Sequence, residues 1–424
     1  MTDRRAERKA LWELAALYAA EGIPYGFFAQ GLPVLFRAQG ASNTVVGLLH
    51  LLYLPWTFKP LWAPVVDTWH LPALGRRRTW ILGTQLGVVL CCLAGAALLG
   101  FFPVVAVLPV VFLVNVLAAT QDIAVDGYAV SRLTDRTRGL GNAIQVCGYK
   151  AGMVLGGGAI LWAAGSLGWR AGLFAVAAVM AALVPVSVFL REPPAPPAAA
   201  PGRTSAVEAA RATFRQLFRG RNAWALAWLC TTVKVGEAAA SAMLKPALVD
   251  RGFTVEEIAI WNNTLGLGAS LLGSWLGGTL VTRVPRARAL GTAVALQAAG
   301  IALVVPLFGA PGHWLGTGLV VEHFLTGILT TVLFTFMMDA VDPRFGGTQY
   351  STLAALVVVG TGAGSTLSGV IADAVGYPVL FSGAACVTAA HLLLVPRAEA
   401  ARRAARDGVT AAETKNPAGG GVPL

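Results

Sequence analysis

Apolar stretches alternate with short charged segments along the whole chain, and twelve of these stretches are long enough to cross a bilayer. A membrane-spanning helix needs about 20 predominantly apolar residues. The predicted spans are 11–36, 44–66, 79–99, 104–125, 140–164, 169–190, 223–248, 258–281, 287–307, 314–338, 348–371 and 378–395. The pattern therefore predicts an all-α integral membrane protein with twelve transmembrane helices.

A proline- and alanine-rich segment interrupts this pattern in the middle of the chain, at residues 192–201. A basic stretch at 203–221 follows, and we expect it to form an amphipathic helix at the membrane surface. The predicted domains are an N-terminal six-helix bundle (1–191), a cytoplasmic linker (192–221), a C-terminal six-helix bundle (222–396) and a disordered cytoplasmic tail (397–424).

The two halves of the chain share a weakly repeated pattern of residues. Gln145 is followed eleven residues later by Gly156 in the fifth span, as Gln349 is followed by Gly360 in the eleventh, and two aspartates close both the fourth and the tenth spans. Two parallel repeats of six helices, related by an axis along the membrane normal, are the plan of major facilitator transporters. The sequence therefore predicts that fold, built as two six-helix bundles.

Composition agrees with a membrane protein and narrows its surroundings. With 56% apolar and 12% charged residues, the chain has too little polar surface to cover a soluble globule. If the N-terminus is cytoplasmic, 25 of the 32 lysines and arginines lie in cytoplasmic segments and only three lie outside. This bias predicts that both termini are cytoplasmic. The net charge of +11 then requires no nucleic-acid partner.

Other compositional features point to few partners. The five cysteines are dispersed in apolar stretches, in a pattern that fits neither a disulfide framework nor a zinc site, so we expect no metal and no cofactor. Arginine outnumbers lysine, and alanine, glycine and valine are abundant, a composition typical of a GC-rich bacterial genome. For a bacterial protein, we expect the membrane to be the plasma (inner) membrane. We also expect the protein to be a monomer. Glycine runs at 152–158 and 360–364 are interpreted as close helix packing rather than a nucleotide loop.

Charged residues inside the spans are the strongest functional signal. A charge at the centre of a membrane helix costs roughly +2.5 kcal/mol or more, so such residues usually face a cavity. Glu21, Lys150, Lys234, Glu322 and His323 all fall roughly 13 to 17 Å into their spans at 1.5 Å per residue, near the midplane. Together they form a candidate binding ring.

Two neighbouring pairs within this group leave alternatives open. Glu237 follows Lys234 by one turn, so the two can form an ion pair that serves either the cavity or only the insertion of the helix. His323 could exchange a proton near neutral pH, or it could be structural. Adjacent helical residues point about 100° apart, so Glu322 and His323 need not share one site.

A second charged group lies toward the cytoplasmic ends of the spans. Asp122 and Asp126 are spaced i, i+4 and share a helix face, which would let them hold Lys59 or an arginine of the 76–78 loop. We interpret this group as a gate or a lock of the fold rather than a substrate site. The residues assigned to gating are Lys59, Asp67, Arg76, Asp122, Asp126 and Asp339.

Several of these residues lie in motifs that resemble a known branch of transporters. Lys59-Pro-Leu-Trp-Ala-Pro-Val-Val-Asp67, Gly75-Arg-Arg-Arg78 and Ala118-Ala-Thr-Gln-Asp-Ile-Ala-Val-Asp-Gly-Tyr-Ala129 resemble motifs of the acetyl-coenzyme A transporter family and of the related bacterial muropeptide permeases. Motifs that resemble an orphan facilitator subgroup of this branch are Glu21-Gly-Ile-Pro-Tyr-Gly26, Tyr149-Lys150, Lys234-Val-Gly-Glu237 and Glu322-His-Phe-Leu-Thr-Gly327. The resemblance implies a major facilitator protein, but it does not identify the cargo.

The sequence thus predicts a secondary active transporter, not an enzyme, that moves a polar, anionic small solute by proton-coupled alternating access. Its expected partners are that solute, protons and the lipid bilayer. The residues assigned to substrate binding are Lys150, Lys234, Gln145, Tyr149, Tyr25 and Asn262, and those assigned to proton coupling are Glu21, Glu237, Glu322 and His323. The alternatives are a membrane-embedded acyltransferase and a receptor with a transporter fold that does not transport.

Overall fold

The computed structural model describes residues 2–38, 49–134, 136–190, 192, 222–253, 257 and 259–414. Every regular element in this part of the chain is helical. The first half contains α1 (Thr2–Ala38), a 3-10 turn (Leu49–Tyr53), α3 (Leu54–Phe58), a second 3-10 turn (Lys59–Leu61), α4 (Ala63–Thr68), α5 (Arg76–Leu98), a 3-10 turn (Val104–Val107), α6 (Leu108–Arg132), α7 (Arg138–Val154), a π-helix (Leu155–Ile160), α8 (Leu161–Leu167) and α9 (Trp169–Val188).

The second half repeats this succession of long helices. It contains α11 (Ala223–Thr232), α12 (Val235–Asp250), a π-helix (Ala259–Gly266), α14 (Leu267–Arg283), α15 (Arg286–Leu307), α16 (Gly312–Met338), a 3-10 turn (Pro343–Phe345), α17 (Gly346–Val375), α18 (Tyr377–Ala390), a 3-10 turn (His391–Leu393) and α19 (Val395–Thr414). Each of the twelve predicted spans overlaps one of these helices or a series of consecutive helical segments, in agreement with twelve transmembrane helices.

Seven helices of the described residues are by themselves long and apolar enough to cross a membrane, and the pair 377–393 and 395–406, bent by 47°, would make an eighth. The other predicted spans correspond to α1 and to the interrupted helical segments 49–68, 223–250 and 259–283. Three of these four spans consist of shorter helical segments, so no single helix in them is long enough to cross a membrane.

Two of these interruptions place a lysine at a helix break. Proline lacks the backbone N–H and breaks a helix interior, and Pro55, Pro60 and Pro64 divide the second span into α3, a 3-10 turn and α4, with Lys59 at the junction. The seventh span breaks between α11 and α12, where Lys234 lies. The apolar pattern predicts both spans as continuous helices, so these breaks differ from the prediction.

The chain forms two compact units. Unit 1 comprises Met1–Leu133, Cys147–Thr213 and Pro343–Ser351, and unit 2 comprises Thr134–Val146, Phe214–Asp342 and Thr352–Leu424. The first residues of α7 and of α17 thus belong to a different unit from the rest of each helix. The predicted boundaries at 191 and 222 stay predictions, and residues 193–221 of the predicted linker lie outside the described part of the chain.

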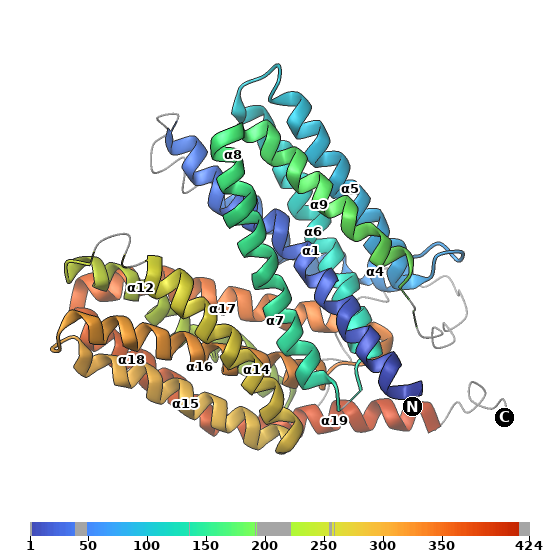
Figure 1. Cartoon of the computed structure of the whole chain (residues 1–424). Coiled ribbons are helices and arrows are strands. Elements are labelled where there is room, and N and C mark those ends of the chain that lie inside the picture. The colour runs from blue at the N-terminus through green and yellow to red at the C-terminus, as the bar shows by residue number, and fades with distance from the viewer. Residues whose placement is uncertain are drawn as a thin grey trace. The chain divides into compact units, whose positions relative to one another are not determined.

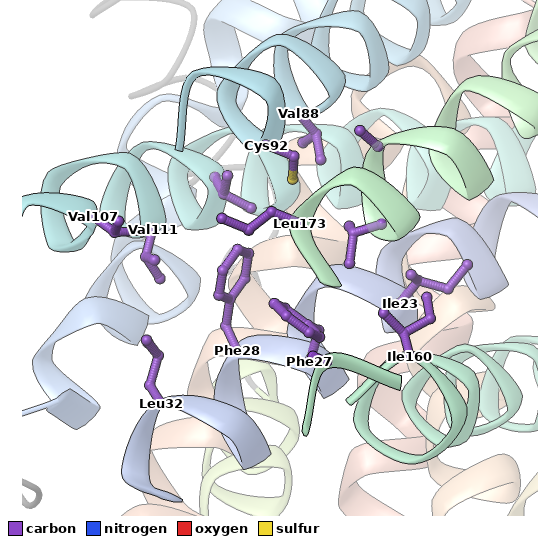
Figure 2. Close-up of a cluster of buried hydrophobic side chains, with 14 of the residues drawn as sticks. Ile23, Phe27, Phe28, Leu32, Val88, Cys92, Val107, Val111, Ile160 and Leu173 are labelled. Carbon is purple, nitrogen blue, oxygen red and sulfur yellow. The ribbon is translucent and has the colours of Figure 1, made fainter. Parts of the chain in front are cut away.

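Unit 1 is held together by an apolar core between α1, α5, α6 and α9. Figure 1 shows α5 running alongside α9, and the close-up in Figure 2 shows Phe27 and Phe28 of α1 directed toward Leu173 of α9 and Val88 of α5. These side chains are almost completely buried. In unit 2 an equivalent core joins α12, α15, α16 and α18.

Glycine allows the closest helix contacts in both units. A Cβ added at Gly152 or Gly156 would collide with backbone carbonyls of α1. A Cβ added at Gly360 or Gly364 would collide with carbonyls at the α11–α12 junction. The interpretation of the two glycine runs as packing surfaces is confirmed at these four positions.

The C-terminal segment differs from its prediction. The residue pattern predicts disorder from residue 397, but α19 continues as a helix to Thr414. Its Glu399 accepts hydrogen bonds from Arg402 Nε and Arg403 Nε, both at 2.7 Å. Ion pairs between side chains three and four residues apart stabilise an exposed helix, and Ala398 is fully buried. Ion pairs within the helix and burial of Ala398 therefore stabilise a helix in a segment whose polar composition predicts disorder.

Candidate functional site: two buried charged clusters

The first cluster lies in unit 1, where Lys59 forms an ion pair with Asp122 of α6. The pairing agrees with the prediction that an acid of the fourth span holds Lys59. The Lys59 ammonium also lies 5.6 Å from the centre of the Trp56 ring, within the range of a cation–π contact. Asp67, rather than Asp126 or Asp122, binds the loop arginine Arg76, with 3.1 Å between Nη2 and Oδ1.

Two further carboxylates belong to this cluster. The Tyr18 hydroxyl donates to Asp126 Oδ1 at 3.0 Å. Glu21 is 1% exposed, and neither of its carboxylate oxygens has a hydrogen bond of good geometry among the described residues, although Gln121 lies beside it. Depth along the spans separates Glu21 from the acids of the fourth span, but Glu21 interacts electrostatically with Asp122, Asp126 and Lys59. The structure thus brings three carboxylates around one ammonium.

Aromatic rings adjoin this cluster. The Tyr25 ring centre lies 5.2 Å from that of Tyr53, 6.1 Å from that of Trp56 and 5.7 Å from that of Tyr149. The Trp56 indole N–H donates to Asn115 Oδ1 at 3.0 Å, which fixes the ring. Sequence reasoning missed Tyr53 and Trp56, although aromatic residues beside a lysine within a membrane span were an available signal. Lys150 follows Tyr149 on α7 and is partly buried.

Asp67 forms a separate site at the end of α4. Its carboxylate accepts hydrogen bonds from the Thr348 backbone N–H at 2.7 Å and the Thr348 hydroxyl at 2.6 Å, in the first turn of α17. Arg77 Nη1 lies 2.6 Å from Asp67 Oδ1. A carboxylate at a helix N-terminus satisfies free N–H groups and complements the helix dipole. Burial would raise the pKa of Asp67, but Arg77, Arg76 and Thr348 together hold that pKa below its usual value.

The second charged cluster lies in unit 2, at the α11–α12 junction. Lys234 Nζ lies 3.1 Å from Glu237 Oε2, so the ion pair predicted from their spacing is present. The same ammonium donates to Thr330 Oγ1 of α16 at 2.7 Å. Both charged side chains are largely buried.

Glu322 of α16 accepts hydrogen bonds from several polar side chains of the same unit. Its Oε1 accepts hydrogen bonds from the hydroxyls of Thr326 at 2.9 Å and Ser241 at 3.1 Å, and from the Gln297 amide at 3.3 Å. His323 Nδ1 lies 3.1 Å from Glu322 Oε2. The sequence left open whether these adjacent residues share a site, and this contact brings their side chains together.

Asp339 binds three arginines at the end of α16. Arg138 Nη1 lies 2.6 Å from Asp339 Oδ1, Arg286 Nε donates to Oδ2, and Arg402 Nη1 of α19 lies 3.9 Å from Oδ2. All of these residues belong to unit 2. Of the other predicted binding residues, Gln145 is a buried residue of α7, whereas the side chain of Asn262 lies outside the described part of the structure.

Comparison with known proteins defines the class. The family model of the Major Facilitator Superfamily matches residues 14–353. The anhydromuropeptide permease of Escherichia coli (strain K12) is 31% identical over 405 residues, which are 91% of this chain and 79% of that protein. This chain belongs to the major facilitator superfamily, and it resembles the muropeptide permease branch of it.

Solved structures show the same fold at low sequence identity. The Escherichia coli fucose:proton symporter matches 92% of this chain and 98% of its own, with a TM-score of 0.73 and 13% identity. The human organic anion transporter MFSD10 matches 92% of this chain and 99% of its own, with a TM-score of 0.71 and 16% identity. These similarities support the all-helical major facilitator fold and say nothing about cargo.

Proposed function

We propose that this protein is a secondary active transporter that moves a polar, anionic small solute by alternating access, coupled to protons. The observation that carries the proposal is the presence of buried charges at helix breaks inside the membrane spans of both units. Charged groups in a membrane interior are retained where they face a substrate or ion pathway. Transporters of this kind form their sites where interrupted helices expose polar groups.

The anionic group of the solute is assigned to Lys150 and Lys234. Lys234 is held at the α11–α12 junction by Glu237 and Thr330, with 3.1 Å and 2.7 Å between the heavy atoms. A lysine ammonium carries three donors, so it can keep these two partners and still bind an anion. Tyr25, Tyr149, Gln145 and Asn262 complete the proposed binding residues.

The coupling proton is assigned to Glu21, Glu237, Glu322 or His323. Glu21 supports this assignment most directly, because its buried oxygens have no hydrogen-bond donor of good geometry among the described residues. Burying an ionised carboxylate without a donor is costly, and a bound proton removes that cost. Glu322 supports it through its contact with His323, a residue whose charge changes near neutral pH.

The gate is assigned to Lys59, Asp67, Arg76, Asp122, Asp126 and Asp339. Asp67 links the end of α4 to the first turn of α17, and Asp339 links α16 to the starts of α7 and α15. Charge-assisted hydrogen bonds at helix ends are strong yet reversible. We place the protein in the plasma (inner) membrane, as a monomer with both termini in the cytoplasm.

Uptake by proteoliposomes tests the proposal. Because the Escherichia coli relative is named an anhydromuropeptide permease, muropeptides are the first cargo to test, followed by acyl-coenzyme A and small organic anions. We expect Lys150→Ala and Lys234→Ala to abolish saturable uptake, whereas Lys9→Ala, at the exposed start of α1, leaves it intact. If both interior variants transport at the wild-type rate, the binding assignment fails. Uptake that a proton ionophore leaves unchanged contradicts the coupling.

A further inference from the structure

A groove of about 470 Å³ lies in unit 1 and takes no part in the charged clusters described above. It is lined by Leu54, Pro55, Phe58, Trp62, Val65, Val66, Trp80, Phe112, Val116 and Thr120. The lining comes from α3, α4, the start of α5 and α6, and it is almost entirely apolar. Leu54, Phe58 and Phe112 expose large parts of their side chains at its edge.

The groove offers nothing to a polar ligand. The Trp62 indole N–H is occupied by Thr120 Oγ1 at 3.0 Å, and the Trp80 indole N–H is occupied by the Trp69 carbonyl at 2.8 Å. An apolar cavity that lacks polar partners does not hold ordered water. Since α5 and α6 are membrane-spanning helices, hydrocarbon is the material available to fill it.

We propose that this groove binds one acyl chain of a bilayer phospholipid. Its wall on α6, a continuous helix, extends over residues 112–120, which is roughly 12 Å at 1.5 Å per residue. The hydrocarbon of one leaflet is about 15 Å deep, half of the whole core. The groove therefore accommodates most of the length of one acyl chain and belongs to the leaflet on the side of the 69–75 turn. Trp69 and Trp80 at that end are typical of residues at the membrane–water boundary.

A lipid chain bound in the groove would also affect the charged cluster around Lys59. Phe58 of the groove precedes Lys59, and Thr120 lies two residues before Asp122 on α6. The second span is interrupted there, so it lacks part of the continuous backbone hydrogen bonding that stiffens a helix, and its position against α6 depends more on side-chain packing. A bound acyl chain supplies packing on the outer side of the interrupted span, and so stabilises the position of Lys59 opposite Asp122.

Photolabelling in proteoliposomes tests the site. The probe is a phospholipid with a photoactivatable diazirine in one acyl chain, and the labelled peptides are mapped by mass spectrometry. We expect Phe58 and Phe112 to be labelled well above Leu90, an exposed residue of α5 outside the groove. Val116→Trp fills the groove and should reduce this labelling about tenfold, the effect of losing about 1.4 kcal/mol of affinity. Val370→Trp, the same change at an exposed position of α17, should leave it unchanged.

Two outcomes overturn the proposal: labelling of the groove no stronger than that of Leu90, or equal labelling in Val116→Trp and the wild type. If Val116→Trp does not fold, Val65→Trp at the groove surface carries the same test. A second measurement is the Tm of delipidated protein on adding phospholipid, which should rise in the wild type and in Val370→Trp but not in the filled variant. Neither readout requires transport, so the site can be assessed even if the proposed function fails.

Discussion

Lys59 and Asp122 form an ion pair at the point where the second membrane span is interrupted, and their side chains are only 6% and 11% exposed. Two more carboxylates, Glu21 and Asp126, interact with the same ammonium. The attraction between buried charges compensates for their lost hydration only while both partners are present. Lys59 therefore determines whether three buried acids are tolerated in this part of unit 1.

Removing the ammonium alone should be strongly destabilising. Breaking a buried ion pair on one side typically costs about 3–5 kcal/mol, because the other charge is left buried without a partner. We expect Lys59→Ala to lower the unfolding free energy by about this amount, measured by chemical denaturation in a fixed detergent. The double variant Lys59→Met with Asp122→Leu should recover part of the loss, since it removes one of the uncompensated acids together with the ammonium, while Glu21 and Asp126 still lose their interaction with it.

The exposed lysine of α1 provides the control. Lys9 lies 3.5 Å from Glu13 and its side chain is 47% exposed. The Glu13 side chain is only 7% exposed, but its carboxylate keeps the hydrogen bond that it accepts from the Tyr128 hydroxyl at 2.7 Å when Lys9 is removed. Lys9→Ala should therefore cost much less stability than Lys59→Ala. A Lys59→Ala protein as stable as Lys9→Ala would show that the buried pair does not hold this region together.

Acid should weaken the contact between Asp67 and α17. The folded-state pKa of Asp67 lies below its ordinary value of 3.8, because Arg77, Arg76 and Thr348 outweigh the effect of burial. A carboxylate with a lowered pKa stabilises the fold above its ordinary pKa, and this stabilisation disappears as the pH falls through the folded-state value. The Tm difference between wild type and Asp67→Asn should be constant from pH 7 to about pH 5 and should shrink below about pH 4.

An exposed acid separates this effect from general acid sensitivity. Asp373→Asn, at the other end of α17, should follow the wild-type Tm at every pH. A gap between wild type and Asp67→Asn that stays the same down to about pH 3 would mean that the carboxylate charge is not what stabilises the start of α17.

Gly347 should tolerate no side chain. A Cβ at this position would lie 2.7 Å from Asp67 Oδ1, 2.9 Å from Arg77 Nη1 and 3.0 Å from the Ile123 carbonyl oxygen. Overpacking of this kind costs about 1–3 kcal/mol, and it would push the Asp67 carboxylate away from Thr348. We expect Gly347→Ala to lower the unfolding free energy by that amount.

The same helix contains a matched control. A Cβ added at Gly362 of α17 would meet no atom of a neighbouring element within 4 Å, so an alanine fits there freely. Alanine is favoured over glycine in a helix interior by about 0.5–1 kcal/mol, and Gly362→Ala should be neutral or slightly stabilising. Equal behaviour of the two alanine variants would contradict a tight contact at Gly347.

Hydropathy alone predicted the helical class and the approximate spans, because the cost of placing polar backbone in lipid leaves few alternatives to a helix. Short-range spacing also predicted the Lys234–Glu237 pair, which lies within one turn. The break at Lys59 was predictable in principle, since Pro55 and Pro60 flank it in the sequence. These features are local, so the pattern of residues contains them directly.

Contacts between distant parts of the chain were not predictable in the same way. Asp67 and Thr348 are 281 residues apart, and only the packed chain shows that the aspartate caps the helix containing the threonine. Depth along a helix placed Glu21 with the lysines of the predicted ring, but depth does not give the direction of a side chain. That direction joins Glu21 to Asp122 and Asp126 instead.

Glu322 offers a sharper test of proton coupling, because its surroundings tolerate an uncharged substitute. The hydroxyls of Ser241 and Thr326 can accept as well as donate hydrogen bonds, so the amide of Glu322→Gln can keep partners that the carboxylate has. The change therefore removes a proton-binding group with little effect on packing.

We expect Glu322→Gln to exchange cargo across the proteoliposome membrane near the wild-type rate but to lose accumulation driven by a pH gradient. Glu257→Gln, at an exposed acid, should retain both activities. Accumulation that persists in Glu322→Gln would exclude this carboxylate as the coupling site, and the same pair of assays on Glu21→Gln would then test the cluster around Lys59.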